Sequence, residues 1–169
     1  MRSPLQLRAL SVRQPWAWAI IHAGKDIENR GHVAIWKGGM KPGRRIAIHA
    51  SKGMTRDEYV GAYDFMRSIG VVCPPAGALI RGAVIGTVEV IDIVTRSSSP
   101  WFFGPRGLVL RDPEPCEPIA ASGQLGFFVW SAGGAIEQPM KWMLPKAGEA
   151  HAPDAAAASD DLFGCSEGK

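Results

Sequence analysis

The sequence predicts a mainly β domain of the α+β class, in which five to six short strands form a closed or nearly closed barrel with two main flanking helices. Segments rich in β-branched and apolar residues are short and are separated by turns that contain glycine and proline. The two segments with helical signals do not alternate with the strands as they would in a parallel α/β fold. The 169 residues suffice for one domain, and 46% of them are hydrophobic, so the chain can bury a core.

The first expected elements are a strand over residues 7–12 and a helix over Trp16–Ala23. Pro15 suits the start of a helix, because its missing N–H would have no partner there. Gly24 suits the end of the helix, because glycine readily adopts the left-handed conformation that terminates many helices. Residues 25–30 contain one large apolar side chain and are expected to form a short polar strand or turn.

The middle of the chain predicts two more strands and the second helix. The strands are expected over residues 33–36 and 45–49, beside glycine and proline turn signals. The stretch Thr55–Glu58 matches a capping box, in which a threonine hydroxyl and a glutamate carboxylate accept from each other's backbone N–H groups. Gly70 is expected to end the helix. The apolar residues behind the box recur at the spacing of one helix face: Tyr59, Ala62, Tyr63 and Met66.

The strongest strand signal lies in residues 82–94, where β-branched residues are dense. Gly86 within it indicates a bulge or a close approach of other atoms, since a strand interior otherwise disfavours glycine. Residues 107–111 and 124–130 predict two further strands.

The domain is expected to span residues 1–145. Trp142 and Leu144 are expected to close its edge. From Lys146 onward alanine, serine and acidic residues dominate, and few side chains could pack. We therefore interpret 146–169 as a low-complexity, mostly disordered tail.

Charge is distributed unevenly along the chain. Residues 1–60 carry 11 Lys and Arg against 4 Asp and Glu, whereas residues 61–169 carry 8 against 12. A basic half favours a polyanionic partner, because lysine and arginine displace condensed counterions from phosphates. A solvated surface with scattered charges is the alternative, and charge alone does not decide between the two.

The remaining composition argues against several classes of protein. The apolar stretches are too short or too interrupted to cross a bilayer, and residues 1–10 lack a signal-peptide pattern. We therefore expect a cytoplasmic protein with no membrane partner. Three distant cysteines fit neither a disulfide framework nor a zinc site, and the four histidines lack metal-ligand spacing. We expect no metal and no cofactor, and the sequence leaves the oligomeric state open.

The first candidate site surrounds the first expected helix. Arg13 and Gln14 lie at its start, and Lys25, Glu28 and Arg30 follow its end. In an extended segment alternate side chains share a face, so Glu28 and Arg30 would lie on one face and Lys25 on the other. A turn at Gly24 could bend Lys25 back toward Glu28. A lysine and a carboxylate in one cleft can act as a base and an electrostatic clamp. An ordinary surface salt bridge is the alternative.

Two further groups are candidates for contact with a nucleic acid. His49, Ser51 and Lys52 stand between a strand and the capped helix, where N–H groups, a hydroxyl and a cation can hold a phosphate. Trp101 belongs to an aromatic segment with turn signals, and exposed aromatic rings stack on bases. The alternatives are a plain connecting loop for the first group and a hydrophobic plug of the barrel for the second.

The stretch from Leu10 to Trp18, taken with Gly24 to Arg30, resembles the opening of ASCH domains. That family's pattern is a strand, Gln-Pro-Trp/Tyr-Ala, a helix, and then a glycine and Lys-x-x-Glu-x-Arg or a close variant. The resemblance covers roughly residues 7–145. Three later segments look like later strands of the family: Ile46–Lys52, Gly82–Asp92 and Gly123–Phe127.

The resemblance implies a PUA-like barrel with a cleft beside the first helix, and RNA or a nucleotide-sized ligand as partner. If the domain is a hydrolase, Lys25 and Glu28 would be its catalytic residues. The relatives include amidohydrolases that act on acetylated cytidine and ribonucleases, and for a ribonuclease Ser51 and Lys52 would be further candidates beside Lys25. Lys25 matches the lysine of those amidohydrolases, whereas Glu28 stands where they carry a threonine, and their later glutamate has no counterpart here.

Two interpretations without catalysis stay open, a reader module for RNA or a modified base, and a protein-interaction domain whose aromatic residues are core. The residues expected to bind nucleic acid are Arg13, Gln14, Trp16, Arg30, His49, Ser51, Lys52 and Trp101.

Overall fold

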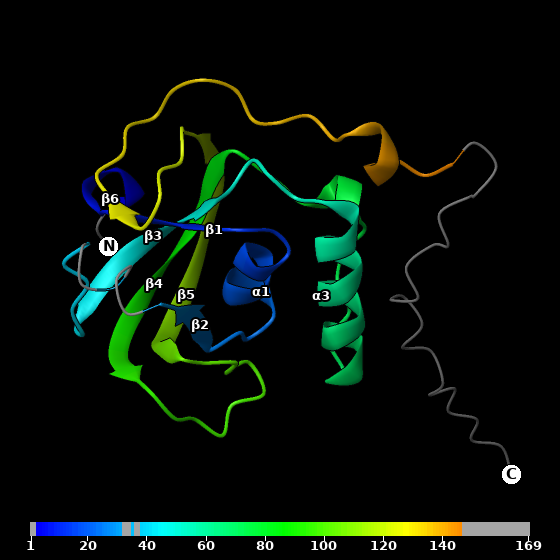
Figure 1. The fold of residues 1–169 in the computed structure, drawn as a ribbon. Helices are drawn as coiled ribbons and strands as arrows, with labels where there is room; N and C mark the ends of the chain where they lie inside the picture. Colours follow the sequence, from blue (N-terminus) through cyan, green and yellow to red (C-terminus); the bar gives the residue numbers. More distant parts are fainter. Residues whose placement is uncertain (1–2, 32–34, 36–37, 147–169) are drawn as a thin grey trace, which may run out of the picture.

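The computed structural model describes residues 3–31, 35 and 38–146. These residues form a curled sheet with α1 inside its curve and α3 on the far side of α1 (Figure 1). The strands are β1 (Ala9–Val12), β2 (Ile27–Arg30), β3 (Arg44–Ala50), β4 (Ala83–Val94), β5 (Arg106–Ala120) and β6 (Phe127–Phe128). The helices are α1 (Trp16–His22) and α3 (Arg56–Ser68), with 3-10 turns η1 (Pro4–Gln6), η2 (Ala76–Ala78) and η3 (Lys141–Met143).

The sheet is mixed and open. Its strands follow the order β2-β5-β4-β3-β1-β6, in which β1 and β3 are parallel and the other neighbours are antiparallel. Among the described residues β2 and β6 stand at the two edges of this order, so the sheet is a half-barrel wrapped around α1 (Figure 1). The mainly β composition, the six strands and the two helices are confirmed. The closed or nearly closed barrel is corrected to a half-barrel, because α1 occupies the concave side between the two edges.

The main core lies between α1 and the concave face of the sheet. Ile20 and Ile21 of α1 pack against sheet residues such as Ile48, and all three are at most 5% exposed. Burial of each such side chain contributes about 1.5–3 kcal/mol. Gly86 on β4 makes room for the helix, because a Cβ there would lie 2.8 Å from Ile21 Cδ1 and 2.6 Å from the Glu114 carbonyl oxygen. The close approach predicted at Gly86 is therefore confirmed.

The helix α3 begins with the predicted capping box. Thr55 Oγ1 accepts from Glu58 N at 3.2 Å, and Glu58 Oε2 accepts from Thr55 N at 2.8 Å. Met66 is fully buried against α1, but Tyr63 is 36% exposed and packs beside the Tyr59 ring. The apolar face predicted for this helix therefore includes one residue too many, because Tyr63 lies at the edge of the stripe through which α3 contacts the rest of the domain.

The strand β5 is longer than the predicted 107–111, although it contains prolines that usually interrupt a sheet. Its pairing with β2 ends at Val109, so beyond that residue β5 pairs with β4 alone. The other edge of β5 is then open, and a proline there removes no ladder hydrogen bond. The prolines lie in this edge portion: Pro113, Pro115 and Pro118.

Other predicted elements are shorter than expected or cannot be compared. β6 covers two residues of the predicted strand 124–130. The predicted strand 33–36 lies outside the described residues except for Ile35, which is buried and helical, so the strand prediction is wrong at this residue. The predicted tail lies outside them beyond Lys146. Trp142 and Leu144, expected to close the domain edge, lie at η3, where Trp142 packs beside the Tyr59 ring of α3.

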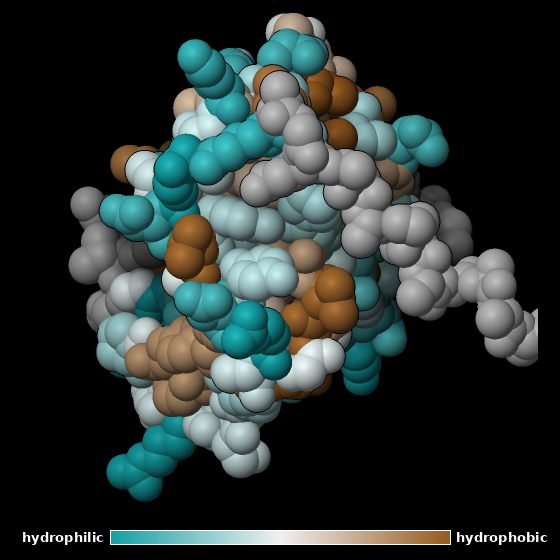
Figure 2. All heavy atoms as spheres, turned by 90° about the vertical axis from the view of Figure 1, so that its right-hand side faces the viewer, coloured by the Kyte–Doolittle hydropathy of each residue, from teal (hydrophilic) through white to brown (hydrophobic). Residues whose placement is uncertain are grey.

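The face of the molecule on the α3 side carries hydrophobic side chains as separate patches among hydrophilic ones (Figure 2). In the described part of the chain, no helix combines the length and the apolar character needed to span a membrane.

Candidate functional site

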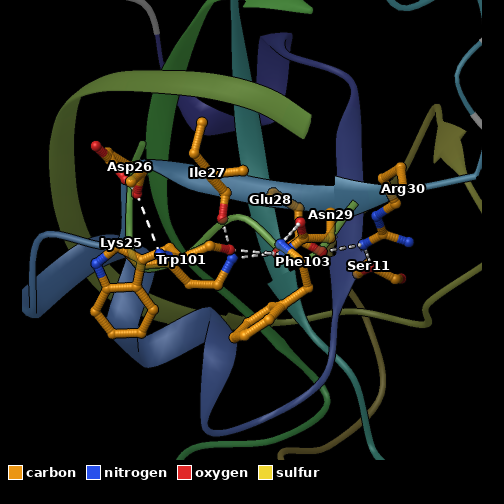
Figure 3. A network of polar contacts seen from close by, with 10 residues as sticks. Ser11, Lys25, Asp26, Ile27, Glu28, Asn29, Arg30, Trp101 and Phe103 are labelled. Atoms are coloured by element: carbon orange, nitrogen blue, oxygen red, sulfur yellow. Dashed lines mark hydrogen bonds and ion pairs between the residues drawn. The ribbon is translucent and has the colours of Figure 1, made fainter. Parts of the chain in front are cut away.

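Lys25, Glu28 and Arg30 meet in one polar network along β2 (Figure 3). Gly24 has a φ of +69°, and this left-handed turn ends α1 and directs the chain back toward β2. Lys25 Nζ donates to Glu28 Oε2 at 2.8 Å and to the Ile27 carbonyl oxygen, and Arg30 Nη2 forms an ion pair with Glu28 Oε1 at 3.0 Å. Lys25 thus lies beside Glu28, as expected from the sequence. The pair is buried, so the alternative of an ordinary surface salt bridge is wrong.

The network is largely withdrawn from water. Lys25 is 3% exposed and Glu28 is 7% exposed. Buried charges need compensating partners, because their transfer from water costs several kcal/mol per ion. One carboxylate here compensates two cations, and Arg30 Nη2 also donates to the Ser11 carbonyl oxygen at 2.6 Å. Arg30 therefore connects β2 to β1, while the charged atoms of Lys25 and Glu28 are bonded within the network and are almost entirely buried.

Ser11 joins this network to a second polar group. It stands beside His49 in the parallel pairing of β1 and β3, and its Oγ lies 3.1 Å from His49 Nδ1. His49 Nε2 lies 3.0 Å from the Ala121 carbonyl oxygen. A carbonyl oxygen can only accept, so in the neutral ring Nε2 carries the proton and Nδ1 accepts from the Ser11 hydroxyl. Both ring nitrogens of His49 are thus engaged.

Burial lowers the pKa of His49 below its ordinary value of 6.5. Loss of hydration is the largest cause, since the residue is 1% exposed. The hydrogen bond to Ala121 raises the pKa in part, and the positive charge of Lys52 lowers it again. The lowered pKa favours the neutral ring near pH 7, and in this form Nδ1 can accept from the Ser11 hydroxyl.

His49, Ser51 and Lys52 line one hollow of about 470 Å³ with Ser11. We call it the β1–β3 hollow. Its remaining lining is the loop after β5, composed of Ser122, Gly123, Gln124 and Leu125. The lining offers hydroxyl groups, a side-chain amide and one cation. This is the chemistry that holds sugar hydroxyls and phosphate oxygens.

Two features determine how much positive charge the β1–β3 hollow presents. Lys52 Nζ lies 3.0 Å from a carboxylate oxygen of Glu137, and both side chains are partly exposed. Exposed pairs of this kind are weak, so a phosphate can compete for the ammonium group. The backbone N–H groups of Gly123, Gln124 and Leu125 donate to no acceptor within the described residues. The loop that carries these N–H groups lines the hollow.

Arg13 and Gln14, at the start of α1, face different environments. Arg13 is exposed and forms an ion pair with Glu58 of α3. Gln14 is 2% exposed, and its amide accepts from Trp18 N at 2.9 Å and donates to the Ile80 carbonyl oxygen at 2.7 Å. The amide of Gln14 is thus employed inside the protein, where it caps the backbone of α1.

The aromatic residues predicted to stack on bases belong to a cluster between α1 and α3. Trp16, Phe65, Trp101 and Phe103 have ring centroids 5.0–6.4 Å apart. Trp101 is 4% exposed and packs as core, whereas Phe103 is 60% exposed. Asn29 fixes this segment by donating to the Trp101 carbonyl oxygen and accepting from Phe103 N, both at 2.8 Å (Figure 3). Phe103 is the ring that a base could reach, and the sequence did not single it out.

Sequence reasoning also missed Ser11 and Gly123. Ser11 and His49 are 38 positions apart, so no local spacing connects them. Gly123 lies directly over the pair, because a Cβ there would stand 2.5 Å from His49 Cε1 and 2.9 Å from Ser11 Oγ. A glycine beside polar residues in a loop was the signal available, but many loops carry it.

A second hollow, of about 730 Å³, lies between the first turn of α3 and η3. Its lining includes three exposed cations, and within the described residues none of them lies in ion-pair distance of a carboxylate: Arg56, Lys141 and Lys146. The Arg56 guanidinium lies 5.8 Å from the centroid of the Trp142 ring. The site residues predicted from the sequence do not extend to this hollow.

No group of three or more His, Cys, Asp and Glu side chains in the described segments is placed to hold a metal ion. Neither a scan against protein-family models nor a search of curated proteins gives a match for this chain. What the β1–β3 hollow binds must therefore be inferred from its own residues.

Proposed function

We propose that this chain is an ASCH-type domain of the PUA-like kind that binds RNA, or a nucleotide-sized part of it, in the β1–β3 hollow. The observation that carries the proposal is the convergence of His49, Ser51 and Lys52 on one hollow of about 470 Å³. That volume is in the range of about 300–1,000 Å³ found for small-ligand sites. The cytoplasmic location expected from the sequence is part of the same proposal.

The chemistry of the hollow suits a phosphate and a sugar more than an apolar ligand. Lys52 supplies a cation, Ser11 and Ser51 supply hydroxyl groups, and the loop at Gly123 supplies backbone N–H groups. Neutral His49 holds the Ser11 hydroxyl in place. The buried network of Lys25, Glu28 and Arg30 contacts this site through Arg30, which donates to the Ser11 carbonyl oxygen and so fixes the backbone at Ser11.

In this proposal Lys25 and Glu28 are positioning residues. Their charged atoms are bonded to each other and to the backbone, and less than a tenth of either residue is exposed. Catalysis by Lys25 would require the network to open. The predicted hydrolase activities, on RNA or on acetylated cytidine, are tested by incubating each substrate with the wild type and with Lys25→Met. Because Lys25 is a positioning residue in this proposal, the variant should turn over each substrate at the same rate as the wild type, or neither protein should turn it over.

The binding test is the salt dependence of the affinity for a short single-stranded RNA. Each phosphate that the protein neutralises should contribute about 0.7 to the slope of log affinity against log salt. Lys52→Gln should weaken binding and reduce this slope by about one contact. Lys141→Gln, which removes the same charge at the second hollow, is the matched control and should change the slope less.

The outcomes separate the interpretations. Equal effects of Lys52→Gln and Lys141→Gln would indicate general attraction to a basic surface and would remove the case for the β1–β3 hollow. Affinity that barely responds to salt would contradict the phosphate contacts altogether and would favour a protein partner.

A further inference from the structure

We propose that Ser11 and His49 are a nucleophile and its general base, and that the β1–β3 hollow carries out acyl transfer from a small ester or amide ligand. The proposed function enters only in locating the ligand in this hollow. The chemistry itself rests on the geometry of these two residues and of the loop above them.

The arrangement has the three parts that activate a serine. The base stands within hydrogen-bond reach of the nucleophile, with Ser11 Oγ 3.1 Å from His49 Nδ1. A third group orients the base, because the Ala121 carbonyl oxygen accepts from Nε2 at 3.0 Å. Nucleophile, base and orienting acceptor in such contact are the signature of covalent catalysis on unrelated folds. The in-register pairing of Ser11 with His49 across β1 and β3 fixes the relative position of the two side chains.

The protonation state suits the role. A base must be neutral to accept a proton, and burial lowers the pKa of His49 below 6.5. Lys52 is the charged group that acts on the ring, and it favours the same neutral state. The ring is buried, while Ser11 is partly exposed and lines the hollow. The proton acceptor is thus shielded from bulk water, and the nucleophile is accessible to a ligand.

The loop after β5 passes close to the pair and can stabilise the reaction. A side chain at position 123 would collide with both Ser11 and His49, so only a glycine fits this close to the pair. The N–H groups of Gly123 and Gln124, which donate to no described acceptor, can donate to an oxyanion. Lys52 at the rim provides positive charge for the same purpose.

The reaction is a balanced hydrolysis in two steps. Ser11 Oγ bonds to the acyl carbon while its proton passes to His49 Nδ1 and the carbonyl electron pair moves to the oxygen. The carbon–oxygen or carbon–nitrogen bond of the leaving group then breaks, and the leaving group takes the proton from His49. Water then attacks the acyl carbon while its proton passes to His49 Nδ1. The acyl–oxygen bond to Ser11 breaks, and Ser11 Oγ takes the proton back from His49, which releases a carboxylic acid and the free hydroxyl. One water is consumed for each acyl group transferred.

The test uses the full chain, a fluorophosphonate probe and p-nitrophenyl acetate as a small ester. Mass spectrometry should find the phosphonyl adduct on the peptide that contains Ser11. Ser11→Ala should abolish the adduct, and His49→Gln should slow its formation about 100-fold or more. Ser98→Ala, a change at an exposed serine outside the hollow, should leave labelling unchanged. The labelling rate should rise with pH and level off above a pKa lower than 6.5.

Ser11→Cys tests the same pair of residues if His49→Gln does not fold. In Ser11→Cys the imidazole should stabilise a thiolate, so alkylation at position 11 should persist at pH values where the other thiols do not react. Absence of an adduct on Ser11 in the folded wild type, or alkylation of Ser11→Cys with an ordinary thiol pH profile, would overturn the proposal. If RNA still binds with the expected salt slope, the acyl-transfer inference alone fails. If salt-dependent binding is missing while Ser11 is labelled, the RNA proposal alone fails.

Discussion

Replacing Glu28 with leucine removes the one carboxylate that compensates two cations of the polar network along β2. Lys25 Nζ lies 2.8 Å and Arg30 Nη2 lies 3.0 Å from the Glu28 oxygens, and the Lys25 side chain is 2% exposed. In Glu28→Leu the Lys25 ammonium would keep the Ile27 carbonyl oxygen but would lose its counter-charge. Removing one partner of a buried pair costs about 3–5 kcal/mol, because an uncompensated charge stays buried. We expect Glu28→Leu to lower the free energy of unfolding by that amount.

The other side of the pair behaves differently. In Lys25→Met the Glu28 carboxylate keeps Arg30, and methionine fills much of the space of the lysine stem. The loss should therefore be about 1.5–3 kcal/mol, the cost of about one charged hydrogen bond. The double variant Lys25→Met/Glu28→Leu should be more stable than Glu28→Leu alone, because no buried ammonium remains and Arg30 is 21% exposed and can be hydrated.

Urea unfolding at pH 7, followed by circular dichroism, measures all three variants against the wild type under one salt condition. In a parallel thermal unfolding experiment each kcal/mol should appear as a shift of about 2–4 °C in Tm for a chain of this size. A loss below about 1 kcal/mol for Glu28→Leu, or a loss for Lys25→Met as large as that for Glu28→Leu, would refute the assignment of Glu28 as the shared counter-charge.

Two further predictions concern Gly86 and His49. Gly86→Ala should destabilise the protein by about 1–3 kcal/mol, because the new Cβ would lie 2.6 Å from the Glu114 carbonyl oxygen. Gly61→Ala, where a Cβ on α3 meets nothing within 4 Å, should instead stabilise it by about 0.5–1 kcal/mol, and denaturant unfolding compares the two. Native His49 has a pKa below the 6.5 of the unfolded chain, so the unfolded state binds more protons as the pH falls. The contribution of His49 to stability is therefore present above about pH 6.5 and is lost as the pH falls toward the lower pKa of the folded state. If the free energy of unfolding of the wild type and of His49→Gln depended on pH with the same slope, this prediction would be wrong.

Local signals in the sequence were sufficient for several elements. The capping box at Thr55–Glu58 fixes the start of α3, because all its groups lie within four consecutive residues. Gly24 marks the end of α1 for the same reason, since a left-handed turn is a property of one residue. The approach of Lys25 to Glu28 also followed from the sequence, because three positions separate them.

Signals that depend on distant partners were incomplete. The length of β5 could not be predicted, since its prolines are tolerated because β2 pairs only with the first part of the strand and leaves the rest of that edge open. The burial of Trp101 could not be predicted either, because its exposure depends on α1 and α3 and not on its own neighbours. The curvature that leaves a half-barrel likewise depends on α1 inside the sheet.

The sequence by itself determined the element types, the basic N-terminal part and the residues Lys25, Glu28, His49, Ser51 and Lys52 as candidates for a site. Only the tertiary structure decided that Lys25 and Glu28 are withdrawn into a buried network while the other three line an open hollow. It also decided that Ser11 connects the two groups, with its carbonyl oxygen bonded to Arg30 and its hydroxyl to His49. The physical reason is that helix caps and turns arise from neighbouring residues, whereas burial and contacts across strands depend on segments far apart in the chain.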